Sequence, residues 1–103
     1  MKLNEMFDLG GKVAIVTGGG RGIGKFIATG LAEAGANLMI ASRKVENCEK
    51  VAQELESHGI KAIATKMDVA IEEDVNNMID MTMKEFGKID ILVNNAGITW
   101  GAP

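Results

Sequence analysis

Hydrophobic residues follow two patterns along the chain: short continuous runs, and longer segments with apolar residues every three or four positions. The continuous runs cover residues 12–17, 37–41, 60–67 and 90–94. Runs of this kind are typical of strands that are buried on both faces, as in a parallel sheet. The run at 60–67 is the least apolar of the four, so we expect that strand near an edge of the sheet.

The segments between these runs have the spacing of helices. Their apolar stripes are Ile23, Phe26, Ile27, Gly30, Leu31 and Ala34; then Val45, Cys48, Val51, Ala52 and Leu55; then Ile71, Val75, Met78, Ile79 and Phe86. Gly35, Gly59 and Gly87 follow them, where a left-handed residue commonly ends a helix. The order β-α-β-α-β-α-β with short connections predicts an α/β fold with a doubly wound parallel sheet and right-handed crossovers.

Composition narrows the class of protein. The chain has 103 residues, of which 47% are hydrophobic and 24% charged, so it is one globular domain at most and not a disordered segment. The net charge of −3, without a block of like charges, argues against binding to nucleic acid or to an anionic membrane surface. No apolar run approaches the roughly 20 residues of a membrane helix. The single cysteine, Cys48, fits a reducing compartment, and we expect a cytoplasmic protein.

A glycine-rich segment, residues 17–24 (TGGGRGIG), connects the first predicted strand to the first predicted helix. Glycines allow a positive φ and leave no Cβ to obstruct the backbone. The N–H groups and the dipole at the start of a helix attract an anion. The segment therefore predicts a phosphate-binding turn, and the alternative is a tight loop without a ligand. Within the helix, Gly30 is expected to allow close packing on the sheet.

The spacing of these glycines resembles one protein family. Gly18, Gly22 and Gly24 follow Thr17 in the pattern T-G-x-x-x-G-x-G, not in the commoner G-x-G-x-x-G. This is similar to the turn of the short-chain dehydrogenase/reductase family. The run N-N-A-G at 94–97 and the pair D-V at 68–69 are two further elements of that family, each after a predicted strand. The resemblance implies a Rossmann-type fold, with residues 1–103 forming four strands of a larger family sheet.

The resemblance also implies a cofactor site. It assigns the pyrophosphate to the glycine turn, the adenine to an acidic residue and its neighbour after the third strand, and the ribose to the N-N-A-G run. In this sequence the pyrophosphate corresponds to Gly18, Gly22, Ile23 and Gly24, the adenine to Asp68 and Val69, and the ribose to the run 94–97 with Asn95, Ala96 and Gly97. Thr17, Gly20 and Arg21, in the same turn, are also expected to bind the cofactor. Two alternatives remain open: Asp68 has a possible role as a cap for the segment that follows, and Asn95 could be purely structural.

The end of the second strand indicates which cofactor is bound. A protein that binds NAD usually has Asp or Glu about 20 residues after the glycine motif, where it binds the ribose 2′-hydroxyl. Here the sequence is Ser42-Arg43-Lys44, without an acid. Arg43 and Arg21 can pair with a 2′-phosphate and Ser42 can donate to it, so we expect NADP(H). The alternative is that both arginines are solvated surface charges.

The family's catalytic groups are expected to be missing from this chain. Family members use a Tyr-x-x-x-Lys pair, a serine and a later asparagine, but the chain has no tyrosine, and Ser42 and Ser57 both precede the fourth strand. We therefore expect a part that binds the cofactor and is inactive alone, with no catalytic residue and no metal site. For the complete protein the resemblance implies reversible carbonyl–alcohol conversion on a small molecule, with reductases of 3-oxoacyl-[acyl-carrier-protein] as the favoured members. The alternatives are a gluconate or polyol dehydrogenase, a non-catalytic dinucleotide sensor, and a methyltransferase, against which Ser42 and Arg43 argue.

The fourth strand is expected to lie at an edge, because the family's next strand is missing. Ile91, Leu92 and Val93 would then have backbone groups without a partner strand, and such an edge favours self-association. We expect low stability, association through this strand, and a homo-oligomer for the complete protein.

Overall fold

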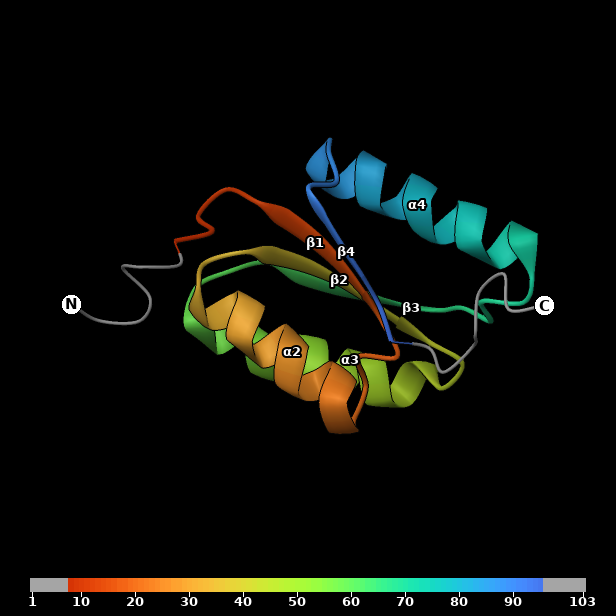
Figure 1. The fold of residues 1–103 in the computed structure, drawn as a ribbon, viewed down its shortest axis with the longest axis horizontal. Coiled ribbons are helices and arrows are strands. Elements are labelled where there is room, and N and C mark those ends of the chain that lie inside the picture. Colours follow the sequence, from red (N-terminus) through yellow and green to blue (C-terminus); the bar gives the residue numbers. More distant parts are fainter. Residues whose placement is uncertain (1–7, 96–103) are drawn as a thin grey trace.

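The computed structural model describes residues 8–95, which form a four-stranded parallel sheet with helices on both faces (Figure 1). The strands are β1 (Val13–Thr17), β2 (Asn37–Ser42), β3 (Ala62–Lys66) and β4 (Ile91–Asn94). Their order in the sheet is β3-β2-β1-β4, and every pair is parallel. The predicted parallel sheet is confirmed, as is the position of β3 at an edge.

Three helices connect the strands. Helix α2 (Gly22–Glu33) and helix α3 (Val45–Leu55), which continues into the short 3₁₀ helix η1 (Glu56–His58), lie on one face of the sheet. Helix α4 (Glu72–Phe86) covers the opposite face (Figure 1). The sheet is thus doubly wound, as the alternation of strands and helices predicts.

Glycines end the helical segments as predicted. Gly59 and Gly87 adopt the left-handed conformation, with φ of 85° and 79°, and Gly35 has a φ of 99°. At the end of α4 the N–H of Gly87 donates to the carbonyl of Met83 over 2.8 Å. A residue without a Cβ reaches this conformation at little cost, so each glycine allows the chain to turn towards the next strand.

The buried face of α2 differs from the predicted stripe. Ile23 and Phe26 are 70% and 80% exposed, whereas the buried positions are Gly24, Ala28 and Ala32. These small residues, spaced by four, let the helix backbone lie close to the sheet, and hydrophobicity alone does not distinguish them from larger apolar neighbours. The expectation for Gly30 was also wrong: this glycine is exposed, and a Cβ there would have no atom within 4 Å.

Side chains on the two faces of the sheet form separate cores. Alternate residues of β1 and β2 point to the face that α2 and α3 cover, where the larger cluster includes Val16, Leu38, Ile40 and Leu55. The other alternate residues form a smaller cluster under α4 with Met67 and Met78, and its strand members are Ile15, Met39 and Ala41. Burying each of the large side chains contributes about 1.5–3 kcal/mol, so β1 and β2, apolar on both faces, anchor the fold.

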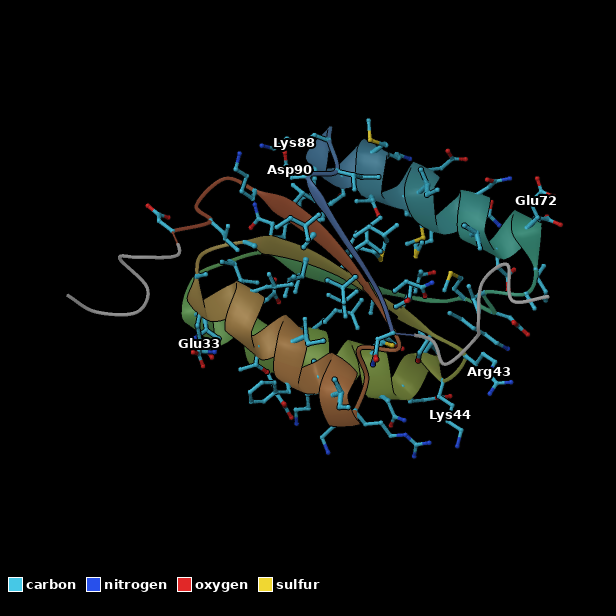
Figure 2. The ribbon with its side chains drawn as sticks, in the orientation of Figure 1. Glu33, Arg43, Lys44, Glu72, Lys88 and Asp90 are labelled. Atoms are coloured by element: carbon cyan, nitrogen blue, oxygen red, sulfur yellow. The ribbon has the colours of Figure 1, made fainter. Side chains whose placement is uncertain are left out.

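Asp90 joins the start of β4 to the start of β1. Its Oδ2 accepts the N–H of Val13 over 2.9 Å, while its own N–H donates to the Val13 carbonyl over 2.8 Å. Lys88 lies 3.2 Å from the same carboxylate, and both side chains stand at the end of the sheet opposite Arg43 and Lys44 (Figure 2). The hydrogen bond from the Val13 N–H is the main reason that the pKa of Asp90 lies below its usual value, and Lys88 lowers this pKa further.

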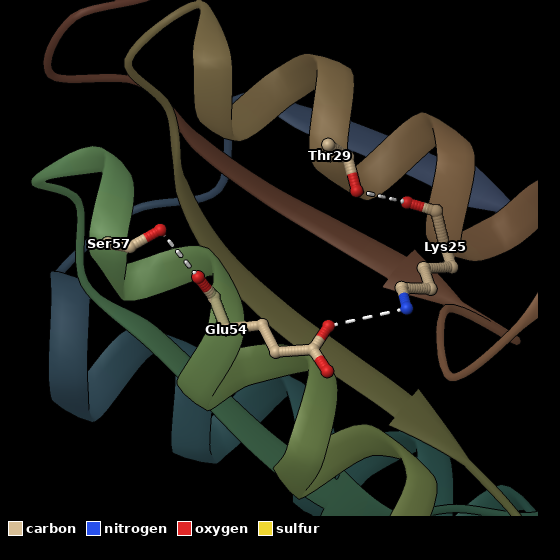
Figure 3. Close-up of polar contacts among 4 residues, drawn as sticks. All are labelled: Lys25, Thr29, Glu54 and Ser57. Carbon is tan, nitrogen blue, oxygen red and sulfur yellow. Dashed lines mark hydrogen bonds and ion pairs between the residues drawn. The ribbon is translucent and has the colours of Figure 1, made fainter.

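Helices α2 and α3 contact each other through a surface ion pair. The Nζ of Lys25 lies 3.3 Å from a carboxylate oxygen of Glu54 (Figure 3). Two hydroxyls bond to the backbone beside it: Thr29 donates to the carbonyl of Lys25, and Ser57 donates to that of Glu54, both over 2.8 Å. An exposed pair of this kind contributes about 0–1 kcal/mol, so the helices are held mainly by the core beneath them.

The fourth strand forms the other edge of the described sheet, as expected. Its residues alternate between half-buried and exposed, and Leu92 is 64% exposed. Whether this edge associates with another chain stays a prediction.

None of the helices within residues 8–95 has both the length and the apolar character needed to cross a membrane.

Candidate functional site

A cavity of about 800 Å³ opens at the carboxyl ends of the strands. Its described lining residues come from the glycine turn, from the segments that follow β2 and β3, and from the end of β4: Gly18, Gly20, Arg21, Gly22, Ser42, Arg43, Lys44, Asn47, Met67, Asp68, Val69 and Asn95. Ligands of open parallel sheets bind in this position, where the strand order reverses, here between β1 and β4. The volume is in the range of small-molecule and cofactor sites.

The glycine turn has no room for a side chain at Gly20 or Gly24. Gly18 and Gly22 have φ values of +71° and +61°, which favour glycine. A Cβ on Gly24 would lie 2.0 Å from the carbonyl oxygen of Gly18, and one on Gly20 would lie 2.9 Å from the Cβ of Asn47. The turn therefore packs directly against the first turns of both α2 and α3.

The start of α2 is open to an anion. Arg21 is the N-cap residue but has extended backbone and makes no side-chain cap, and the first turn contains no acidic residue. By contrast, the first turn of α4 contains Glu72, Glu73 and Asp74. The first N–H groups of a helix have no partner within the helix, and Arg21 and Gly22 at the start of α2 line the cavity, so this helix start is a candidate anion site.

Thr17 supports this turn from below. Its hydroxyl donates to Oδ1 of Asn94, 3.0 Å away, and accepts the N–H of Asn95 over 2.9 Å. The side-chain nitrogen of Asn95 lies 2.9 Å from where a Cβ on Gly24 would be. Thr17 therefore fastens the ends of β1 and β4 together, while Asn95 both packs on α2 and lines the cavity.

Ser42 ends β2 in a local hydrogen-bond network. Its hydroxyl accepts the N–H of Lys44 over 3.2 Å and lies 3.1 Å from the Lys44 carbonyl and 2.9 Å from the sulfur of Cys48. Cys48 is buried, and burial raises the pKa of its thiol. The thiol therefore stays neutral at pH 7 and is a packing and hydrogen-bonding group, not a nucleophile.

The rim of the cavity beside β2 is positively charged. Arg21, Arg43 and Lys44 are exposed, and Figure 2 shows the side chains of Arg43 and Lys44 extending outward where β2 leads into α3. Among the described lining residues the one acid is Asp68, which follows β3. An anionic group beside β2 would thus have cations near it and no carboxylate on that rim.

Asp68 holds the loop between β3 and α4. Its Oδ1 accepts the N–H of Ala70 over 2.9 Å, and its own N–H donates to a carboxylate oxygen of Asp74 over 3.0 Å. The N-cap residue of α4 is Ile71 and not Asp68, so the suggested capping role applies to the loop before the helix. Val69, beside it, is half-buried and also lines the cavity.

The structure brings together most of the predicted site residues. Twelve of the fourteen fall within the described chain, and nine of these line the cavity. Thr17 and Gly24 do not belong to the lining but contact the residues of the turn, whereas Ile23 is exposed on α2. Ala96 and Gly97 lie outside the described residues. Lys44, Asn47 and Met67 also line the cavity, although they are not among the residues predicted from the sequence. Lys44 directly follows the predicted Ser42-Arg43 pair, but Asn47 carries no signal in the linear sequence.

Comparison with known proteins identifies the family. The family model for short chain dehydrogenases matches residues 12–103. The chain belongs to the short-chain dehydrogenase/reductase family. The predicted resemblance is therefore confirmed, and with it the Rossmann-type fold.

Within residues 8–95 no group of three or more histidine, cysteine or acidic side chains is placed to hold a metal ion.

Several relatives match most of the chain but only part of their own length. It is 46% identical to versicolorin reductase 1 of Dothistroma septosporum over 95 residues, 91% of this chain and 36% of that protein. It is 41% identical to a rhamnolipids biosynthesis 3-oxoacyl-[acyl-carrier-protein] reductase of Pseudomonas aeruginosa over 97% of this chain and 39% of that protein. It is 38% identical to 5-keto-D-gluconate 5-reductase of Escherichia coli, over 93% of this chain and 38% of that protein. The chain thus spans well under half the length of these relatives.

A solved structure has the same arrangement of elements. L-Sorbose reductase from Gluconobacter frateurii, complexed with NADPH and L-sorbose, is similar with a TM-score of 0.85 and 38% identity. The match covers 89% of this chain and 35% of that one.

Proposed function

We propose that this chain is the NADP(H)-binding part of a short-chain oxidoreductase, which interconverts a carbonyl and an alcohol of a small molecule by hydride transfer. One observation carries the proposal. The cavity at the carboxyl ends of the strands combines an uncapped helix start, at α2, with a cationic rim beside β2. These two features match the two phosphate groups of such a cofactor, the pyrophosphate and the 2′-phosphate.

Each part of the cofactor has candidate contacts in this chain. The N–H groups after Gly18 and at the start of α2 would hold the pyrophosphate, since the glycines leave the backbone accessible. Asp68 and Val69 would contact the adenine, and the segment from Asn95 to Gly97 would border the ribose. Bound there, the cofactor would supply or accept the hydride, while the residues of this chain bind and orient it.

The preference for NADP(H) over NAD(H) follows from charge. A carboxylate at the end of β2 would accept bonds from the ribose hydroxyls and repel a 2′-phosphate. Here that position is Ser42, Arg43 follows it, and Arg21 lines the same cavity. Guanidinium groups bind phosphate oxygens in pairs, so this rim favours the phosphorylated cofactor.

The substrate class is proposed from the relatives. We favour a reductase of 3-oxoacyl-[acyl-carrier-protein] type, because the relative with that name matches 97% of this chain. The alternative is a gluconate or polyol dehydrogenase, supported by similarity to 5-keto-D-gluconate 5-reductase. The 103-residue chain contains no tyrosine, so we propose that it binds cofactor without turnover. We further propose that the complete protein is a cytoplasmic homo-oligomer.

Calorimetric titration of the protein with NADPH and with NADH tests the cofactor assignment. We expect NADPH to bind at least about tenfold more tightly, the equivalent of one charge-assisted hydrogen bond. Raising the salt concentration should weaken NADPH binding more than NADH binding, since the 2′-phosphate contacts are ionic. Equal affinities would contradict the assignment of the cationic rim.

A further inference from the structure

Asn47 occupies a particular place in the cavity. It is the third residue of α3, it is half-buried, and it lines the cavity together with Ser42, Arg43 and Lys44. Its backbone N–H donates to the Lys44 carbonyl over 3.2 Å, which fixes the first turn of α3. A Cβ on Gly20 would lie 2.9 Å from its Cβ, so the residue stands between the glycine turn and the end of β2.

The side chain of Asn47 has the chemistry to bind an anion. Its carboxamide carries two N–H donors, and it makes no hydrogen bond to the protein within residues 8–95. The charged residues that line this rim are Arg21, Arg43 and Lys44, and Glu46 is its neighbour in α3. A neutral donor among cations can bind a phosphate oxygen without adding a further charge to the rim.

We propose that Asn47 donates a hydrogen bond to the 2′-phosphate of NADP(H) and is a determinant of cofactor specificity. The inference rests on the proposed function of the cavity and deepens it. Asn47 belongs to the segment that follows β2, and the residues that recognise the 2′ position lie at this strand end. The pyrophosphate would be held instead by the residues at the start of α2. Asn47 therefore distinguishes NADPH from NADH, while a residue at the pyrophosphate would bind both equally.

The substitution Asn47→Asp tests the proposal with little change in shape. It converts the donor into an anion that repels the 2′-phosphate, so we expect NADPH affinity to fall more than about tenfold and NADH affinity to change less than about twofold. A negative charge in the first turn of a helix interacts favourably with the helix dipole, so the melting temperature should be unchanged or higher. Loss of affinity with retained stability separates a binding role from a structural one.

The control is Gln53→Glu, the same change from amide to carboxylate two turns further along α3. Gln53 is exposed and does not line this cavity, so this variant should retain the preference for NADPH. Adenosine 2′,5′-bisphosphate and adenosine 5′-phosphate serve as smaller probes, and only the first should lose affinity in Asn47→Asp.

The outcomes separate the inference from the function on which it rests. If the unaltered protein binds NADPH and NADH equally, or binds neither, the proposed NADP(H) function is wrong and the role of Asn47 with it. If the protein prefers NADPH but Asn47→Asp leaves the ratio unchanged, or weakens both cofactors equally, then only the role of Asn47 is overturned. A selective loss of NADPH affinity supports both.

Discussion

The hydroxyl of Thr17 lies 3.0 Å from Oδ1 of Asn94, although 77 positions separate the two residues. The same hydroxyl accepts the N–H of Asn95, so one buried side chain joins the ends of two neighbouring strands directly below the glycine turn. This contact couples the stability of the sheet to the shape of the cofactor cavity.

Thr17→Val should therefore destabilise the protein and weaken cofactor binding together. The variant keeps the shape but removes the hydroxyl, so the part-buried N–H of Asn95 and Oδ1 of Asn94 lose this hydrogen bond at a cost of roughly 1–2 kcal/mol. Urea denaturation measures this loss. Thr29→Val is the control, because Thr29 donates only to the carbonyl of Lys25 within its own helix (Figure 3) and should lose less than about 1 kcal/mol. Equal losses in the two variants would contradict the role of Thr17.

Two glycines of α2 should respond to alanine in opposite directions. Gly24→Ala would place a Cβ 2.0 Å from the Gly18 carbonyl oxygen, so the turn must move, and we expect a loss of more than about 2 kcal/mol together with loss of cofactor binding. Gly30→Ala meets no atom within 4 Å on an exposed helical position, and should stabilise the protein by about 0.5–1 kcal/mol. Thermal denaturation of both variants measures these changes in stability. A destabilised Gly30→Ala would show that Gly30 is packed against other residues and not exposed.

Parts of this fold follow from the sequence and other parts depend on how the elements pack. Strands β1 and β2 were predictable because burial on both faces requires continuous apolar runs. The helix ends at Gly59 and Gly87 were predictable because their left-handed conformation favours glycine. The buried face of α2 was not predictable, because close approach to the sheet selects small residues such as Ala28 over Phe26. Asn47 was missed because it reaches the cavity only when α3 packs against Gly20.

Asp90 should make the protein less stable in acid. Its pKa is lowered mainly by the hydrogen bond from the Val13 N–H and also by Lys88, so the charged form is favoured in the folded state. The contribution of Asp90 to the stability of the fold is therefore complete above the pKa of about 3.9 in the unfolded chain. It is lost as the pH falls through the lower pKa of the folded protein.

Asp90→Asn tests this dependence. The variant should be less stable than the unaltered protein at pH 7, and the difference should shrink as the pH falls below about 4. Urea denaturation at a series of pH values measures it. Asp80→Asn, at an exposed position of α4, is the matched control and should leave the pH profile unchanged. A difference between Asp90→Asn and the unaltered protein that stays constant with pH would contradict the assignment.

Ser42→Asp should reverse the cofactor preference. A carboxylate at the end of β2 would repel the 2′-phosphate and accept hydrogen bonds from the ribose hydroxyls of NADH. We expect NADPH affinity to fall by about tenfold or more and NADH affinity to rise, as measured by calorimetry. Ser57→Asp introduces the same charge at an exposed position beside Glu54 (Figure 3) that does not line the cavity, and should leave the ratio of the two affinities intact. An unchanged ratio in Ser42→Asp would place the 2′ position elsewhere.

The edge strand β4 should govern the association of this chain. Leu92 is 64% exposed in a strand without charged residues, and such an edge can pair with the strand of another copy. Sedimentation of the unaltered chain should detect dimers or larger species, and Leu92→Lys should shift them towards monomer, because an edge lysine opposes strand pairing. Phe26→Lys is the contrasting variant, since Phe26 is 80% exposed on α2 and not on a strand. If Phe26→Lys disperses the assemblies and Leu92→Lys does not, then association occurs through the helical face and the role of the strand edge is wrong.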